Sequence, residues 1–219
     1  MNMHNWFPAV IATLLVIGAG IGVGYVLENV GSPQAASGNG IYHLDLVVTT
    51  DNYFNASVGQ QPAFFVLSGG KLVSSANITL PSDTTIAVTI FNYDNGNGTP
   101  SAPQFLNVTG TTGGTEFVMN NTMVNSTYSG NSISVSGGET VSSVNASVLS
   151  HTFTILNLYG TGSNLNIPVP ESSVVQATFT TGAPGQFIWM CQVPCGSGID
   201  GVSGAMATAG WMTGSITIS

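Results

Sequence analysis

The chain downstream of residue 40 consists of short runs of β-branched and aromatic residues that Gly, Pro, Asn and Asp interrupt. No segment of this region repeats its apolar residues with the period of an amphipathic helix. Short runs bounded by turn-forming residues are typical of β-strands. The pattern therefore predicts a mainly β protein, a sandwich or a barrel. The expected strands are Ile41–Thr50, Ala63–Leu67, Ala76–Leu80, Thr84–Phe91, Glu116–Met119, Ser132–Ser136, Thr152–Leu156, Ser173–Thr180, Gln186–Met190 and Gly214–Ile218.

Charged residues are rare in this chain. They make up 5% of its 219 residues, with a single Lys or Arg against nine acids, and the formal net charge is −8. A chain without a basic surface cannot replace the counterions of phosphates, which excludes a nucleic-acid partner. A hydrophobic content of 43% argues against disorder. Few carboxylates also mean little stability lost at low pH, so the composition suits an acidophile source.

The longest apolar run lies at the N-terminus. From Trp6 to Leu27 there are 22 residues without a charged side chain, which as a helix would extend about 33 Å and cross a bilayer. Trp6 and Tyr25 lie near the ends of the run, where aromatic residues contact lipid headgroups. We therefore expect a transmembrane anchor over residues 1–28, with residues 6–27 in contact with membrane lipid.

The segment that follows the anchor is rich in Gly, Ser, Pro and Ala, and we expect a flexible linker over residues 29–40. The alternative interpretation of the N-terminus is a cleaved signal peptide. Its small-residue cleavage site would lie at Gln34, Ala35 and Ala36.

Seven sequons for N-glycosylation lie downstream of the anchor, and none lies after residue 148. Several sequons behind a hydrophobic anchor favour an extracellular domain over residues 41–219. The stretch near 95–150 is the most polar and predicts a glycosylated insertion. We expect a single-pass protein of the cell membrane with its N-terminus inside. The acceptors are Asn55, Asn77, Asn97, Asn107, Asn120, Asn125 and Asn145.

The only two cysteines, Cys191 and Cys195, lie four positions apart in the Gly-rich loop CQVPCGSGIDGVSGAM (191–206). Outside the cell they could form a disulfide, because that compartment is oxidising. Thiolates also suit copper, particularly together with imidazole, so a metal site is a second possibility. Free thiols are a third.

Three segments resemble subunit II of the haem-copper oxidases: ITLPSDTTIAVTIFNYD (78–94), SHTFTI (150–155) and NIPVPESSVVQATFTTGAPGQFIWMCQVPCG (166–196). The resemblance implies a cupredoxin-like Greek-key β-sandwich behind one N-terminal transmembrane helix. In that family two cysteine thiolates bridge two copper ions, and a histidine from a neighbouring strand completes one side of the site. His151, Cys191 and Cys195 match these ligands.

The chain also departs from the family pattern. Ile199 stands where the family has a second histidine, and Val202 where it has a methionine. Val193 replaces the Glu whose carbonyl is a ligand, and it still offers a carbonyl. Apolar side chains cannot replace an imidazole or a thioether, so we expect no dinuclear copper centre. Relatives that serve quinol-oxidising enzymes commonly lack that centre.

The resemblance therefore implies a non-catalytic subunit of a respiratory terminal oxidase, with membrane-embedded oxidase subunits as partners. Its role would be structural or in docking an electron donor, with no cofactor or a single copper ion. Residues 189–212 would form the glycan-free surface that faces the membrane partner.

Two other functions remain open. One is a stand-alone electron carrier with a mononuclear copper bound by His151, a cysteine and Met206. The other is a glycosylated cell-surface or filament scaffold. His43 shares a strand face with Asp45 and is expected to be solvated. No nucleophile elbow and no phosphate-binding loop is present in the sequence.

Overall fold

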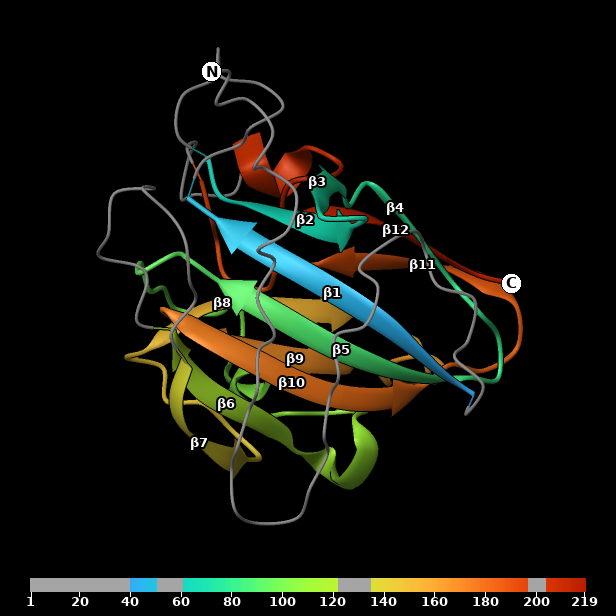
Figure 1. Cartoon of the computed structure of the whole chain (residues 1–219), viewed down its shortest axis with the longest axis horizontal. Helices are drawn as coiled ribbons and strands as arrows, with labels where there is room; N and C mark the ends of the chain where they lie inside the picture. The colour runs from blue at the N-terminus through green and yellow to red at the C-terminus, as the bar shows by residue number, and fades with distance from the viewer. Residues whose placement is uncertain (1–39, 51–60, 122–134, 197–203) are drawn as a thin grey trace, which may run out of the picture.

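Two β-sheets stacked face to face form the molecule in the computed structural model, which describes residues 40–50, 61–121, 135–196 and 204–219 (Figure 1). The seven-stranded sheet has the order β3-β2-β1-β5-β10-β6-β7, and the five-stranded sheet has the order β4-β12-β11-β8-β9. The mainly β sandwich expected from the sequence is confirmed. The strands are β1 Ile41–Thr49, β2 Ala63–Ser68, β3 Lys71–Ser74, β4 Asn77–Leu80, β5 Thr85–Asn92, β6 Glu116–Asn121, β7 Val135–Val141, β8 Leu149–Ile155, β9 Leu165–Pro170, β10 Ser173–Thr180, β11 Gly185–Met190 and β12 Thr213–Ile218. Short 3-10 helices are η2 Pro103–Leu106, η3 Thr112–Gly114 and η6 Gly204–Ala207.

The chain changes sheet repeatedly. It does so from β3 to β4, β4 to β5, β7 to β8, β9 to β10 and β10 to β11. Each sheet contains one parallel pair, β1 with β5 and β4 with β12, and the remaining named pairs are antiparallel.

The core lies between the sheets and follows the two-residue period of the strands. On β1, Leu44, Leu46 and Val48 are at most 2% exposed. In the core near the start of β8, the rings of Phe64, Phe153 and Trp189 pack together, with centroids 5.3 to 6.1 Å apart. Aromatic side chains in such edge and tilted contacts are rigid and bury a large area, so they support the side chains near the start of β8.

Strands β8 and β9 are buried along their whole length, without the alternation of a strand that faces solvent on one side. Part of the chain between β5 and β8 packs against them. Gly98 N donates to Leu149 O at 2.9 Å, and Thr109 forms an isolated bridge with Asn166 of β9. The stretch expected to be a glycosylated insertion near 95–150 therefore also contains β6, β7 and a covering layer for the five-stranded sheet.

Two strands were not expected from the sequence, β3 and β9. Strand β9 contains Pro168 and Pro170, which lack an N–H and argue against a central strand. The two prolines are tolerated because β9 lies at the edge of its sheet. Strand β7 covers 135–141 where the sequence predicted 132–136.

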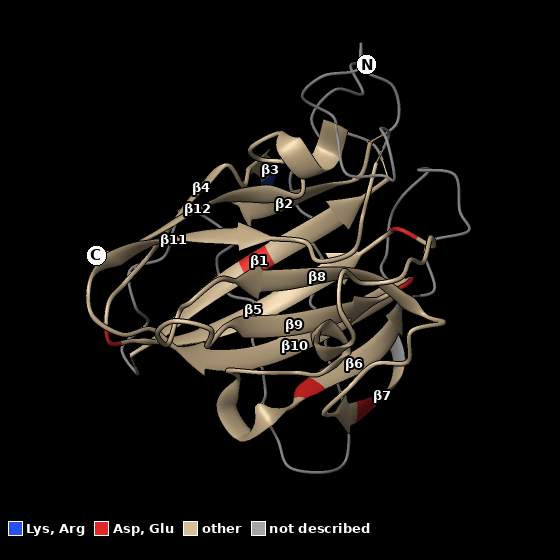
Figure 2. Cartoon of the chain, turned by 180° about the vertical axis from the view of Figure 1, so that it is seen from behind, with Lys and Arg blue, Asp and Glu red and all other residues tan. Residues whose placement is uncertain are grey.

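None of the helices within the described ranges is long and apolar enough to cross a membrane. The anchor expected over residues 1–28 and most of the linker over 29–40 lie outside the described residues. Figure 2 shows how sparse charged residues are, with the one basic residue on β3.

Candidate metal centre

His151 lies near the start of β8, where the register with β9 shifts between Leu149 and His151. Such irregularities redirect a side chain relative to the regular ladder. The imidazole is 2% exposed and packs edge-on against Phe64 at a centroid distance of 6.0 Å. A rigid strand and an aromatic base therefore hold this ring in a buried position.

The cysteine loop begins directly after β11. Cys191 N donates to Met212 O at 2.8 Å, and Cys191 and Cys195 are 0% and 7% exposed. Gly196 has φ +95°, and a Cβ there would lie 2.5 Å from Gln61 Oε1. Only glycine fits this turn, because both the positive φ and the close neighbour exclude a side chain. The loop is thus folded back so that both sulfur atoms point inward.

The three ligand-type residues predicted from the sequence come together. His151 Nδ1 lies 3.2 Å from Cys195 Sγ and 3.9 Å from Cys191 Sγ, and the two sulfur atoms are 3.7 Å apart. The carbonyl oxygen of Val193 lies 3.1 Å from Cys195 Sγ and 3.4 Å from Cys191 Sγ. In the part of the chain that the structure describes, this is the one cluster of His, Cys, Asp or Glu that could hold a metal ion.

These distances fit a single ion. Thiolate and imidazole ligands about 2.0 to 2.3 Å from one tetrahedral ion lie roughly 3.3 to 3.8 Å from each other. The observed separations of 3.2, 3.7 and 3.9 Å bracket that range. Two thiolates and an imidazole form a soft donor set, which copper and zinc accept and which magnesium or calcium does not.

Asp94 belongs to this site, and sequence reasoning missed it. It lies just after β5, and its Oδ2 is 3.0 Å from His151 Nε2. The carboxylate side chain is 15% exposed, so it separates the buried ring from solvent. Asp94 closes the segment 78–94 that carries the family resemblance, and its place at the end of a predicted strand was the available signal.

Electrostatics couple these groups. Burial lowers the pKa of His151, but hydrogen bonds to Asp94 and Cys191 outweigh burial and raise that pKa to about 9. Burial raises the pKa of Asp94, but its hydrogen bond with His151 outweighs burial and holds the pKa below its ordinary value. The site is therefore built for an imidazole whose Nε2 proton faces a carboxylate.

The two thiols differ. Burial raises the pKa of Cys191, but hydrogen bonds from Cys195 and His151 hold it well below its ordinary value. The pKa of Cys195 is raised by its hydrogen bond to Cys191 and by burial. Cys191 Sγ also accepts from Thr152 N at 3.4 Å, which adds a smaller contribution in the same direction. A thiolate in this position is the form that binds metal.

Met206 is the other residue that the sequence predicted as a ligand. Met206 is half-buried on η6 and packs against the hydrophobic core. Ile199 and Val202, where the family pattern is broken, lie outside the described residues. The cysteines are free thiols in this structure, and the disulfide stays an alternative prediction.

Five of the seven sequon asparagines lie within the described ranges, and all five are exposed: Asn77, Asn97, Asn107, Asn120 and Asn145. Asn55 and Asn125 lie outside the described residues. Exposure permits glycosylation, which stays a prediction. On the outward face of β1, His43 and Asp45 are half-buried rather than freely solvated, and burial raises the pKa of Asp45.

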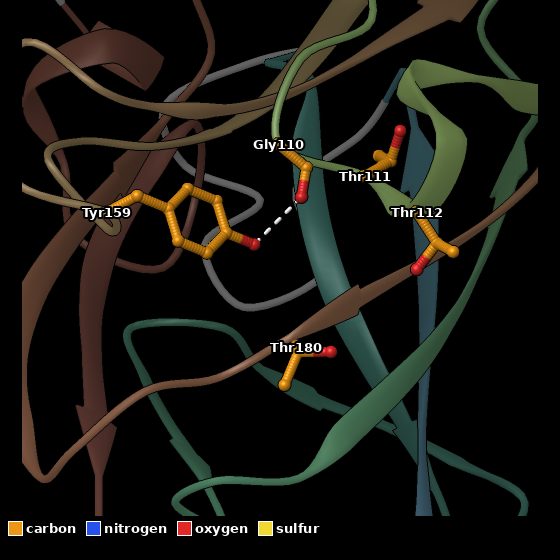
Figure 3. Close-up of a pocket in the computed structure, with 5 residues that line it drawn as sticks. All are labelled: Gly110, Thr111, Thr112, Tyr159 and Thr180. Carbon is orange, nitrogen blue, oxygen red and sulfur yellow. Dashed lines mark hydrogen bonds between the residues drawn. The ribbon is translucent and has the colours of Figure 1, made fainter.

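A shallow hollow of about 380 Å³ lies at the other end of the sandwich (Figure 3). It is lined by Gly110, Thr111, Thr112, Tyr159 and Thr180, and Tyr159 Oη donates to Gly110 O at 2.8 Å. Thr180 pairs with Thr85 at the start of β5, whereas Asp94 follows the end of that strand. The hollow thus contains none of the predicted site residues.

Comparison with known proteins gives weak likenesses only. No protein-family model and no curated protein matches the sequence. Among solved structures, auracyanin B is 15% identical and covers 81% of this chain and 88% of its own, with a TM-score of 0.33. Rusticyanin from Thiobacillus ferrooxidans is 17% identical and covers 87% of this chain and 86% of its own, with a TM-score of 0.34. These scores are too low to establish a shared fold.

Proposed function

We propose that the protein binds a single copper ion through His151, Cys191 and Cys195 and serves in electron transfer. The observation that carries this proposal is the mutual distance of three soft ligand atoms, all within 3.9 Å of one another and all buried. Two buried thiols and an imidazole, brought together from a loop and a strand, form the soft donor set that copper prefers. A metal ion would satisfy all three at once.

When bound there, copper supplies one-electron redox chemistry. The chain itself excludes water from the ligands, because Trp189, Phe64 and the loop leave His151 and Cys191 almost unexposed. The Val193 carbonyl is placed to complete the donor set from the loop itself. A rigid β framework keeps the ligands in place when the charge of the site changes, which suits electron transfer.

The wider setting is part of the proposal. The uncharged run at 6–27 supports an anchor in the cell membrane with the cupredoxin-like domain outside, and the sequons support the same orientation. The three segments that resemble subunit II of haem-copper oxidases support a place in a respiratory terminal oxidase, in contact with its membrane-embedded subunits. The surface around residues 189–212 is the proposed contact.

A second candidate is a subunit of the same complex without copper, in a structural or donor-docking role. Ile199 and Val202 favour it, because both replace metal ligands of the family. In that case His151, Cys191 and Cys195 would be retained as a hydrogen-bonded cluster or, after oxidation, with a disulfide.

Metal analysis and a visible spectrum of the natively purified protein test the proposal. We expect one copper per chain, and none in the Cys191→Ser variant. Two coppers with a mixed-valence paramagnetic signal, or zinc in place of copper, would contradict it. Absence of metal together with co-purifying haem subunits would support the second candidate.

Intact-mass measurement with and without a reductant tests the disulfide alternative. Under the copper proposal, the metal-free protein has the same mass in both conditions when it is purified without an oxidant. An increase by two hydrogen atoms after reduction would show that the cysteines were paired.

A further inference from the structure

The two nitrogen atoms of the His151 ring face different partners. Nδ1 faces the sulfur atoms of the cysteine loop, and Nε2 lies 3.0 Å from Asp94 Oδ2. A carboxylate only accepts hydrogen bonds, so the proton between them is on Nε2. A metal binds the neutral form of the ring, and in that form the lone pair of Nδ1 faces the sulfur side.

Asp94 is itself held firmly. Its backbone N donates to Asn92 Oδ1 at 3.0 Å, and Asn92 Nδ2 donates to Pro170 O at 2.7 Å. Its Oδ1 accepts from Gly96 N at 2.8 Å, and its carbonyl accepts from Ser172 N at 2.9 Å. One carboxylate oxygen is thus occupied by the turn, and the other is left for His151.

The same turn also contacts the cysteine loop. A Cβ at Gly98 would lie 2.6 Å from Val193 Cγ1, so the backbone of the turn packs directly on the residue between the two cysteines. Gly98 N donates to the carbonyl oxygen of Leu149, which lies two residues before His151 on β8. The turn that follows β5 therefore touches both halves of the metal centre.

We propose that Asp94 is a positioning residue that selects the Nε2-protonated form of His151 and so directs Nδ1 to the metal. Its consequence for metal affinity rests on the proposed function, whereas its effect on the ring does not. Partners of this kind orient metal-bound histidines, and their loss typically lowers metal affinity about 10- to 100-fold.

Asp94→Asn is the sharpest substitution. Asp94 accepts from two donors, Gly96 N–H and His151 Nε2–H, and an amide has only one oxygen to offer them. If that oxygen stays on Gly96, the amide NH2 faces Nε2 and favours the form with its proton on Nδ1, where it blocks the metal. Asp94→Ala removes both acceptors and serves as the second variant.

Glu171→Gln is the matched control. Glu171 lies at the same end of the sandwich, and its Oε2 accepts from Asn97 Nδ2 at 3.4 Å. The substitution removes one negative charge there without touching His151. It separates a loss of local charge from a loss of the hydrogen bond.

The first measurement is the ¹H–¹⁵N NMR spectrum of the metal-free, ¹⁵N-labelled full chain. We expect a His151 Nε2–H proton protected from exchange in the unmodified protein and in Glu171→Gln, and its loss in Asp94→Ala. The second is Cu(I) affinity by competition with a chromophoric chelator. Both Asp94 variants should bind about 10- to 100-fold more weakly, and the control within a few-fold of the unmodified protein.

The proposal is overturned if no protected Nε2–H is present in the unmodified protein, or if it persists in Asp94→Ala. It is also overturned if both Asp94 variants bind Cu(I) as tightly as the unmodified chain. If the unmodified chain binds no Cu(I) but shows the protected proton, and Asp94→Ala loses it, the proposed copper function fails and the role of Asp94 toward the ring is upheld. The NMR measurement on the unmodified protein can overturn the proposal even if a variant does not fold.

Discussion

The end of the sandwich at Asp94 and the start of β6 at Glu116 both take a carboxyl group out of water, and the pKa values of the two groups move in opposite directions. Asp94 has a histidine and a backbone N–H as partners, and its pKa is lowered. Glu116 opens β6 at 2% exposure, neither carboxyl oxygen has a hydrogen-bond partner, and burial raises its pKa to about 9. Burial alone therefore does not decide the charge of a group. Its partners do.

The comparison also separates two uses of a polar core. Around His151, buried polar groups satisfy one another in a network that joins β5, β8 and the cysteine loop. At Glu116 the same chain tolerates a polar group that destabilises the fold whenever it must ionise. The first arrangement is what a binding site requires, and the second costs stability without an evident return.

The largest effect is expected from removing His151, which contacts both Asp94 and the cysteines. In the metal-free protein, His151→Ala leaves Asp94 and the Cys191 thiolate without their shared partner, and should lower the free energy of unfolding by about 3 kcal/mol or more. Urea unfolding measures it. His43→Ala, at a half-buried position on β1, is the control and should cost less because solvent screens its contacts. Equal losses in the two variants would contradict the network.

A smaller effect of opposite sign is expected at Glu116. The folded carboxyl keeps its proton to about pH 9, whereas the unfolded one releases it near its ordinary value. Between these values the unfolded state binds fewer protons, so stability is full at low pH and falls by about 1.4 kcal/mol per pH unit as pH rises.

Glu116→Met should therefore raise the free energy of unfolding by about 2 to 3 kcal/mol at pH 7. Between pH 5 and 9, the slope of the free energy of unfolding against pH should fall to about half of the slope in the unmodified protein, or less. Thermal or urea unfolding across that range is the measurement. A variant that is less stable than the unmodified protein at pH 7 would show that Glu116 has a partner after all.

The smallest effect is expected in the polar chain behind the cysteines. Gln192 N donates to Thr152 Oγ1, which lies 2.9 Å from Thr154 Oγ1, and Thr154 Oγ1 donates to Asn166 Oδ1 at 2.6 Å. Thr154→Val keeps the volume but leaves buried groups unpaired on both sides, and should cost about 1 to 2 kcal/mol.

Thr180→Val is the matched control for that change, since Thr180 is exposed. It should alter stability by less than about 0.5 kcal/mol. If Thr154→Val is equally silent, the chain of hydroxyls does not hold β8 and β9 to the cysteine loop.

Much of the fold was open to prediction because strand signals are local. Runs such as Thr84–Phe91 and Ser173–Thr180 carry their β-branched residues and turn residues within a few positions of each other, and the structure places β5 and β10 there. Strand β9 escaped because Pro168 and Pro170 have a meaning that depends on whether the strand is central or at an edge. No local pattern carries that information.

The sequence by itself determined which residue types form the candidate site and that its two cysteines lie close together. Cys191 and Cys195 are four residues apart in a Gly-rich loop, so a tight turn suffices to bring their sulfur atoms together. The low charge and the β-branched runs likewise determined the class of fold. These are properties of short stretches of chain, and elementary residue preferences decide them.

Only the tertiary structure decided that His151 reaches the sulfur atoms from 44 residues away, and that Asp94 reaches His151 from 57 residues away. Both contacts depend on the shifted register at the start of β8, and on the end of β5 and the start of β8 lying at the same end of the sandwich although the two strands belong to different sheets. Register and sheet order are set by the packing of the whole core, since shifting one strand by a residue turns each of its side chains to the other face. For that reason the candidate ligand residues could be named from the sequence, whereas Asp94, which contacts the histidine, could not.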